Sequence, residues 1–279
     1  MEGCSRLKSN EPGMKFRFEN TGAHTGAYNM EYDSRLVDEA RASGDCIVRA
    51  YAWQPYAVSL GYNQDETAID ERTCNAEGID LVRRPTGGRA VLHAEEITYS
   101  VVTPLGSLTT HQWYERIHRA IARGLADVGL SDAAFVKSQP DFAAIYKQAS
   151  SALCFTSSAR YELEWSGKKF VGSAQRVIGG VLLQHGSILL GTFHERLPEF
   201  LFPRLDNAEK KQSNIVRMKD ILKARSISLG EILGRTILFD ECVEPLRKGF
   251  EEEWEMEFTP CSPPYQGGQI FIPVNDTAL

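Results

Sequence analysis

The sequence predicts a mixed α/β (α+β) fold, in which a largely antiparallel sheet is flanked by helices. Strand and helix patterns are interleaved along the 279 residues, which favours a sheet and helices around one core. Several of the strand patterns are separated only by short glycine turns, and such hairpins join antiparallel strands. A doubly wound parallel sheet is therefore not expected.

The first half of the chain supplies most of the predicted elements. Apolar and charged residues alternate over 15–19, as on an edge strand, and 27–42 carries apolar side chains on one helical face. Two apolar runs at 46–53 and 57–61 predict strands with a turn between them. Further predicted elements are a polar helix over 65–77, strands over 79–84, 90–93 and 96–103, and a helix over 110–128 that Gly129 ends.

The second half begins with strands and ends with helices. Residues 160–165 and 169–171 form a predicted hairpin in which Gly167 suits the positive φ of the turn. No regular pattern is evident over 136–150. Further predictions are a turn at 179–180, strands over 181–184 and 187–190, a weak helix over 199–202, helices over 229–233 and 242–254, and a fraying end over 266–279.

Length and composition limit the possible functions. We expect a single catalytic domain over 1–279, with a core at about 14–202 and a helical cover or small C-terminal extension over 203–279. The net charge of −6 disfavours non-specific nucleic-acid binding, which needs basic surfaces. No apolar stretch is long enough to span a bilayer, and 1–20 contains no apolar run of the kind a secretory signal needs. We therefore expect a cytoplasmic protein with no membrane or nucleic-acid partner.

The cysteines do not form a disulfide or zinc pattern. Their spacing is wide and irregular, and no two stand three residues apart. We expect five of the six to be reduced and mostly buried thiols, and we expect no metal site. The six are Cys4, Cys46, Cys74, Cys154, Cys242 and Cys261.

A glycine turn with arginines is the first segment that can carry chemistry. Residues 83–93 read Arg-Arg-Pro-Thr-Gly-Gly-Arg-Ala-Val-Leu-His. Two glycines let main-chain N–H groups approach a ligand closely, and arginine can hold phosphate or carboxylate with two hydrogen bonds. From spacing alone, a hairpin with solvated arginines explains the segment equally well.

Three more segments are ambiguous when each is taken alone. The hairpin 167–175 carries Lys168 and Lys169 before a run of small residues, Gln184-His185-Gly186-Ser187 breaks an apolar run, and Cys154 stands upstream of both. Cysteine is a good acyl carrier because its thiolate is nucleophilic and its thioester stays reactive. A surface hairpin, a structural histidine and a buried thiol are the simpler interpretations.

Taken together and in this order, the segments resemble the family of lipoate–protein ligases, biotin–protein ligases and octanoyltransferases. The resemblance covers about 26–190 and is strongest to the cysteine-dependent, LipM-type octanoyl-[acyl-carrier-protein]:protein N-octanoyltransferases. It implies the fold of the biotin/lipoate ligase catalytic domain. It also implies that Cys154 accepts the acyl group and that Lys169 is the family's pocket lysine. Lys168, one residue away, is expected on the other face of its strand.

The resemblance further implies a set of substrate-binding residues. They come from the glycine turn, from the residues after Lys169 and from the histidine segment. The set is Arg83, Arg84, Thr86, Gly87, Gly88, Arg89, His93, Gly172, Ser173, Ala174, Gln175, His185 and Gly186.

The implied activity is the first step of lipoate assembly. Octanoyl passes from octanoyl-acyl carrier protein through a Cys154 thioester to a lysine of a lipoyl-domain protein. That acceptor is a glycine cleavage H protein or a 2-oxoacid dehydrogenase acyltransferase subunit. No metal or cofactor is implied.

The alternatives are an ATP- and magnesium-dependent lipoate–protein ligase, an amidotransferase between lipoyl domains, and a non-catalytic binding module. Arg89 stands where ligases commonly have a third glycine, which favours the transferase.

Overall fold

The computed structural model describes residues 14–130, 134–136, 162–201 and 207–260. Cys154 and the predicted irregular stretch after residue 136 lie outside these residues, as does the predicted fraying end at 266–279. Within the described residues no helix is long and apolar enough to cross a membrane.

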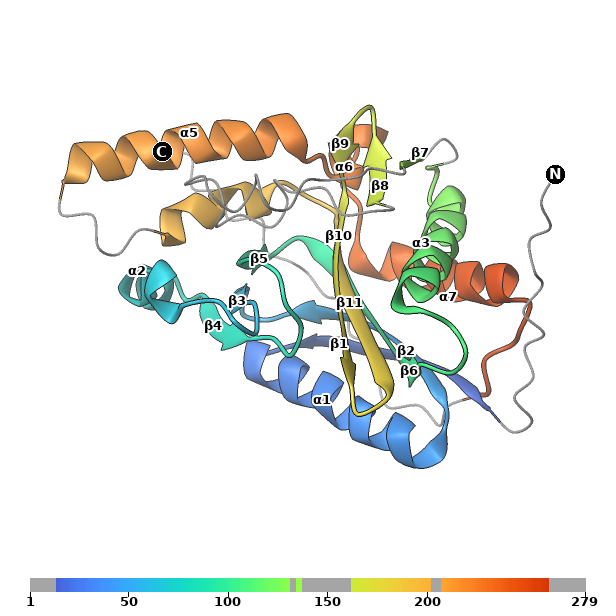
Figure 1. Cartoon of the computed structure of the whole chain (residues 1–279). Helices are drawn as coiled ribbons and strands as arrows, with labels where there is room; N and C mark the ends of the chain where they lie inside the picture. The colour runs from blue at the N-terminus through green and yellow to red at the C-terminus, as the bar shows by residue number, and fades with distance from the viewer. Residues whose placement is uncertain (1–13, 131–133, 137–161, 202–206, 261–279) are drawn as a thin grey trace.

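A five-stranded sheet forms the centre of the protein (Figure 1). Its strand order is β1-β2-β6-β11-β10, and every neighbouring pair is antiparallel except the parallel pair β1 and β2. The predicted mixed and largely antiparallel sheet is therefore confirmed. The strands are β1 (Phe16–His24), β2 (Cys46–Trp53), β6 (Glu96–Pro104), β10 (Val171–Ile178) and β11 (Val181–Leu189).

Helices cover both faces of this sheet (Figure 1). Helix α1 (Gly26–Ser43) packs Leu36, Val37 and Ala40 on one face, and Gly44 ends it in the left-handed conformation. On the other face lie α3 (Thr110–Asp127) and α7 (Phe239–Trp254), which pack closely against each other. Because both faces are covered, all eight residues of β2 are buried.

A smaller three-stranded sheet stands beside the central one. Its order is β4-β3-β5, and it shares a core cluster with η4 (Phe193–Phe200) and with α5 (Ala208–Arg225). The strands are β3 (Ala57–Leu60), β4 (Asp80–Arg83) and β5 (Val91–His93).

A third small sheet contains the predicted hairpin. Strands β8 (Glu162–Trp165) and β9 (Lys168–Lys169) are antiparallel, β7 (Ala134–Val136) pairs with β8, and Gly167 has the expected positive φ of 75°. The predicted helix over 229–233 is confirmed as α6 (Leu229–Leu233).

The structure differs from the sequence predictions in several elements. The weak helix expected over 199–202 is the end of η4, and Leu201 is extended. The strand expected over 169–171 is divided between β9 and β10. The helix expected over 65–77 is two short pieces, η1 (Glu66–Ala68) and α2 (Glu71–Ala76), because Asp65 and Asp70 each cap a separate turn and Ile69 is extended. The two strands expected at 181–184 and 187–190 are one continuous strand, β11. Helix α5 was not anticipated, because only Met218 and Leu222 of its side chains are buried and its apolar pattern is weak.

The described cysteines agree with the expectation of buried thiols. Cys46, Cys74 and Cys242 are free and buried, and burial raises the pKa of the Cys74 thiol to about 11. These three are therefore protonated and unreactive at neutral pH.

Candidate functional site

The loop between β4 and β5 carries the predicted glycine turn, and Arg84 holds it in shape. The Arg84 guanidinium donates hydrogen bonds to the main-chain oxygens of Gly87 and Arg89 and to both oxygens of Ser59, at 2.7–3.2 Å. Gly88 has a φ of 98°, which disfavours any residue with a side chain. The turn therefore depends on glycine and on a buried arginine together.

Close packing fixes the same loop from outside. A Cβ atom on Gly61 would lie only 2.0 Å from the Gly88 oxygen, so this approach requires glycine at 61. The Tyr62 N–H donates to the Thr86 oxygen, and the Arg176 guanidinium donates to the Pro85 oxygen while stacking on the Tyr62 ring.

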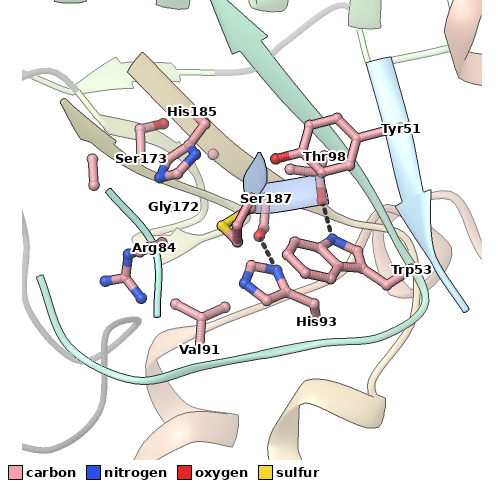
Figure 2. A pocket seen from close by; sticks show the side chains of 13 residues that line it. Tyr51, Trp53, Arg84, Val91, His93, Thr98, Gly172, Ser173, His185 and Ser187 are labelled. Carbon is pink, nitrogen blue, oxygen red and sulfur yellow. Dashed lines mark hydrogen bonds between the residues drawn. The ribbon is translucent and has the colours of Figure 1, made fainter. Parts of the chain in front are cut away.

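A pocket opens between this loop and four strands of the central sheet, β2, β6, β11 and β10 (Figure 2). Its cavity volume is only about 30 Å³, which is room for about one or two water molecules. Its exposed wall is mainly apolar, as the walls of small-molecule sites usually are. The lining residues are Met30, Tyr51, Trp53, Arg84, Val91, His93, Thr98, Gly172, Ser173, Ala174, His185, Gly186 and Ser187.

The strand register builds the floor of the pocket. Tyr51, Thr98, Ser187 and Gly172 are successive partners across β2, β6, β11 and β10. Two residues along, Arg49, Ser100, His185 and Ala174 form a second such row, and its side chains point to the same face because strand side chains alternate. That face is the one α1 covers.

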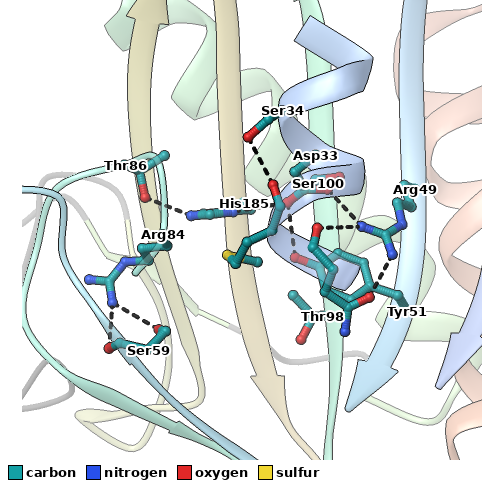
Figure 3. A network of polar contacts seen from close by, with 12 residues as sticks. Asp33, Ser34, Arg49, Tyr51, Ser59, Arg84, Thr86, Thr98, Ser100 and His185 are labelled. Atoms are coloured by element: carbon teal, nitrogen blue, oxygen red, sulfur yellow. Dashed lines mark hydrogen bonds and ion pairs between the residues drawn. The ribbon is translucent and has the colours of Figure 1, made fainter. Parts of the chain in front are cut away.

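A buried ion pair lies under this floor (Figure 3). The Arg49 guanidinium donates to the Asp33 carboxylate at 2.8 Å, and the exposed fraction of each side chain is 0%. Burial alone would raise the pKa of Asp33, but the hydrogen bond from His185 and the charge of Arg49 bring that pKa below its ordinary value. Asp33 is therefore a carboxylate at neutral pH.

His185 connects this ion pair to the glycine turn. Its Nδ1 atom lies 3.1 Å from an Asp33 oxygen, and its Nε2 atom lies 2.6 Å from the Thr86 hydroxyl. Burial lowers the pKa of His185, although Asp33 opposes this effect. The ring is therefore neutral at neutral pH.

A second histidine lies on the opposite wall. His93 stacks on the Trp53 indole at 4.0 Å between ring centroids, with an interplanar angle of 13°. Its Nδ1 atom lies 2.7 Å from Glu96 Oε1, and its Nε2 atom lies 2.7 Å from the Ser59 hydroxyl. Ser59 also accepts from Arg84, so both histidines hold groups that shape the glycine turn.

The nitrogens of both rings are thus bonded to protein groups behind the pocket wall. An imidazole whose two nitrogens are bonded in this way leaves its carbon atoms as the surface for a ligand. The wall therefore accepts an apolar chain better than a polar one.

The chain belongs to a known family. The sequence model described as the lipoyl protein ligase A/B catalytic domain matches residues 25–251. This protein is a member of that family. The resemblance found in the sequence is confirmed.

Curated relatives of this chain in the lipoyl protein ligase A/B family are octanoyltransferases. Octanoyltransferase LipM of Geobacillus kaustophilus is 36% identical over 243 residues, which cover 85% of each chain. Octanoyltransferase LipM of Bacillus subtilis is 32% identical over 254 residues, which cover 88% of each chain.

Solved structures of lipoate–protein ligases share the fold. Lipoate-protein ligase A bound with ATP superposes with a TM-score of 0.67 at 22% identity and covers 88% of both chains. A bi-partite lipoate protein ligase from Thermoplasma acidophilum superposes with a TM-score of 0.64 at 21% identity, over 88% of this chain and 86% of that one.

Lys168 and Lys169, of which Lys169 is the predicted pocket lysine, point in different directions. The Lys168 ammonium donates to the Lys223 oxygen at 2.8 Å on the surface, whereas Lys169 is 6% exposed. The expected alternation of these two side chains is therefore confirmed. The Lys169 oxygen accepts from the Ile227 N–H at 3.0 Å, which anchors β9 to the segment after α5.

A third buried histidine lies beside Lys169. The pKa of His118 is lowered to about 4, chiefly by burial and partly by the positive charge of Lys169. Its Nδ1 atom bonds the Tyr114 oxygen at 2.8 Å and its Nε2 atom lies 3.0 Å from the Ser173 hydroxyl, which is also 2.7 Å from the Tyr99 hydroxyl. The Ser173 hydroxyl therefore turns toward α3.

Gly186 allows β10 and β11 to approach here. A Cβ atom at Gly186 would lie 2.6 Å from the Gly172 oxygen and 2.6 Å from the Ser173 hydroxyl.

Seven of the thirteen residues predicted to bind substrate line the pocket together. They are Arg84, His93, Gly172, Ser173, Ala174, His185 and Gly186.

The other six lie near the pocket without lining it. Thr86, Gly87, Gly88 and Arg89 belong to the loop that forms the wall, and Gln175 follows Ala174 on β10. Arg83 points elsewhere, because its guanidinium donates to the main-chain oxygens of Gly61, Tyr62 and Gln64 and pairs with Glu66. Substrate binding by all thirteen residues stays a prediction.

Sequence reasoning did not identify several residues that define the site. The apolar wall contains Met30, Tyr51, Trp53 and Val91, which look like ordinary core residues in the sequence. One signal was available for the network behind the wall, because Arg49 is a lone charge inside an eight-residue apolar strand. Among the described residues, no group of three or more His, Cys, Asp or Glu side chains is placed to hold a metal.

Proposed function

We propose that this protein is an octanoyltransferase of lipoate assembly, which carries octanoyl as a thioester on Cys154 and transfers it to a lysine of a lipoyl-domain protein. The observation that carries the octanoyl activity is the set of curated octanoyltransferases that match 85–90% of both chains at 32–36% identity. The thioester and the two protein partners are proposals that rest on the matching motifs and on the chemistry below.

The apolar character of the pocket wall supports an acyl substrate, for which the cavity of about 30 Å³ would have to widen. Its wall is mainly apolar, and the indole of Trp53 and the ring of Tyr51 offer flat surfaces for an alkyl chain. An octanoyl chain has seven carbons beyond its carbonyl, and burial of each stabilises binding by about 0.8 kcal/mol. A gain of this size is enough to select octanoyl over much shorter chains.

The first step forms the acyl-enzyme. The Cys154 thiolate attacks the carbonyl carbon of the octanoyl donor and forms a new C–S bond. The C–S bond to the carrier then breaks, and the carrier leaves as a thiolate that takes up a proton.

In the second step the neutral ε-amine of the acceptor lysine attacks the Cys154 thioester. An amide bond forms, the bond to the Cys154 sulfur breaks, and the amine loses one proton. No ATP, metal or other cofactor takes part in either step.

Lys169 supports both steps in this proposal. Its ammonium group favours the thiolate form of a neighbouring cysteine and the negative charge on the thioester oxygen. Strand β10 is an edge of the central sheet, so alternate N–H groups over residues 172–174 point away from β11. One of these groups can donate to the oxyanion, and such a donor contributes about 2.7–4 kcal/mol to lowering the barrier.

The proposed donor is octanoyl-acyl carrier protein. The proposed acceptor is a glycine cleavage H protein or a 2-oxoacid dehydrogenase acyltransferase subunit. We further propose that the protein acts in the cytoplasm.

Intact-mass spectrometry tests the acyl-enzyme directly. The protein is incubated with octanoyl-acyl carrier protein, without ATP and without acceptor. We expect one octanoyl adduct that hydroxylamine removes and that Cys154→Ala does not form.

The matched arm uses free octanoate with ATP, magnesium and a lipoyl domain. If only this arm modifies the lipoyl domain, the protein is a ligase and the thioester proposal is wrong. Transfer from one octanoylated lipoyl domain to another, without transfer from the carrier protein, would instead identify an amidotransferase.

A further inference from the structure

Asp33 lies outside the pocket lining but connects to most of the polar groups beneath it (Figure 3). Its carboxylate accepts hydrogen bonds from Arg49, Tyr51, Ser100 and His185, at 2.8, 3.0, 2.9 and 3.1 Å. All four partners come from three adjacent strands, β2, β6 and β11, so one helical carboxylate ties the floor of the pocket to α1.

The charge state of this cluster fixes the proton on His185. Asp33 and Arg49 are both fully buried and neutralise each other. A further positive charge on His185 would leave the buried cluster with a net charge, which is costly. A carboxylate can only accept a hydrogen bond, so the neutral ring must carry its proton on Nδ1, which faces Asp33.

The other nitrogen of His185 is then an acceptor. Nε2 lies 2.6 Å from the Thr86 hydroxyl, and the Thr86 side chain is fully buried. The hydroxyl therefore donates to Nε2. If the proton of the ring moved to Nε2, that nitrogen would become a donor, and the buried Thr86 hydroxyl would lose its acceptor.

We propose that Asp33 is a positioning residue of the acyl-transfer site, which holds His185 in the Nδ1–H form so that Nε2 fixes Thr86 and the glycine loop against the acyl chain. The inference rests on the octanoyl transfer proposed above. Asp33 does not touch substrate in this scheme. It fixes the orientation of the His185 ring and the conformation of the glycine loop that contact the substrate.

A purely structural ion pair is the competing explanation. It accounts for the contacts with Arg49 and predicts that any change that weakens the cluster reduces activity in proportion to lost stability. The positioning role predicts a separate effect, because only the loss of the carboxylate frees the proton of His185 to move to Nε2.

Nitrogen-15 NMR of the full-length protein with labelled histidines reads the position of this proton. In the wild type we expect His185 to be neutral with a protonated Nδ1 and an unprotonated Nε2 at neutral pH. A wild-type ring protonated on Nε2, or on both nitrogens, would overturn the proposal without any variant being made.

Kinetics of octanoyl-enzyme formation, measured by mass, provide the second readout. For Asp33→Asn we expect the Nε2–H form to appear and the rate constant at saturating donor to fall about 100-fold, because small displacements at a reacting centre have effects of this size.

Asn29→Ala is the matched control. Asn29 accepts from Arg49, so this change weakens the same cluster without removing the carboxylate. It should lower the Tm but keep the Nδ1–H form and the rate. Equal losses of rate in Asp33→Asn and in Asn29→Ala would show a structural role only.

Thr86→Val keeps the test decisive if Asp33→Asn does not fold. This change removes only the hydroxyl, so we expect the Nδ1–H form to persist while the rate falls about as far as in Asp33→Asn. A normal rate in Thr86→Val would refute the proposal. The proposed function is tested apart from it, because it fails only if the wild-type protein itself forms no octanoyl adduct.

Discussion

Buried neutral histidines should make this protein less stable in mild acid. The pKa of His118 is lowered to about 4 and that of His194 to about 4, in both cases chiefly by burial. Histidine in an unfolded chain has a pKa of about 6.5, so as the pH falls the unfolded chain binds these protons before the folded protein does. The stability from the neutral rings is therefore complete above about pH 6.5 and is lost progressively as the pH approaches 4.

The size of the effect follows from the two pKa values. Between about pH 8 and about pH 5, an imidazole shifted from about 6.5 to about 4 lowers the free energy of unfolding by about 2 kcal/mol. His118 and His194 together should therefore contribute about 4 kcal/mol to the loss.

Urea unfolding of the wild type and of His118→Gln at about pH 8 and about pH 5 measures the contribution of one ring. We expect the loss of stability between the two pH values to be about 2 kcal/mol smaller in His118→Gln than in the wild type. His194→Gln should show a similar reduction, and the double variant should show both.

Each variant is compared with itself at two pH values, so the stability that the substitution itself removes at both values cancels. If His118→Gln loses as much stability between these pH values as the wild type does, His118 does not stay neutral in the fold. The hydrogen bond from Ser173 to its Nε2 atom would then need another explanation.

Three substitutions test other parts of the site. Gly186→Ala should lower stability by about 1–3 kcal/mol and abolish octanoyl-enzyme formation, because the new Cβ would lie 2.6 Å from two oxygens of β10. Gly44→Ala is its control, since a left-handed alanine costs about 1–2 kcal/mol far from the pocket and should leave the rate intact. Arg83→Met should lower the free energy of unfolding by about 1–3 kcal/mol, because three main-chain oxygens lose their donor. A raised KM for the donor with unchanged stability would instead place Arg83 on the substrate. Lys169→Met should slow octanoyl-enzyme formation by about 10²–10⁴-fold in a folded protein, whereas Lys168→Met should not, and equal rates in the two would contradict the assigned pocket lysine.

The sequence predicted those elements of the fold whose apolar residues and turn glycines form a local pattern that matches their burial. Helix α3 was found because it has a clear apolar face, and α1 was found because Leu36, Val37 and Ala40 precede a helix-ending glycine, Gly44. The hairpin at Gly167 was found because its turn requires glycine. Helix α5 was missed because only Met218 and Leu222 of its side chains are buried, so its apolar pattern is weak.

The sequence anticipated the candidate site only in its motif segments. Arg84, His93 and His185 belong to these segments, and the fold brings all three to one pocket. The apolar wall was not predicted. In the sequence Tyr51 and Trp53 look like ordinary core residues, and only the tertiary structure shows that they line a cavity.

The order of motifs alone determined the family, the kind of reaction and the residues that should carry it, because glycine turns, a strand lysine and an upstream cysteine are local features. Only the tertiary structure decided where those residues face. The Arg83 side chain donates a hydrogen bond to a neighbouring loop. Asp33 hydrogen-bonds to His185, which lies 152 positions away in the sequence. Cross-strand register and the packing of α1 produce such contacts, and no local pattern in the sequence specifies either.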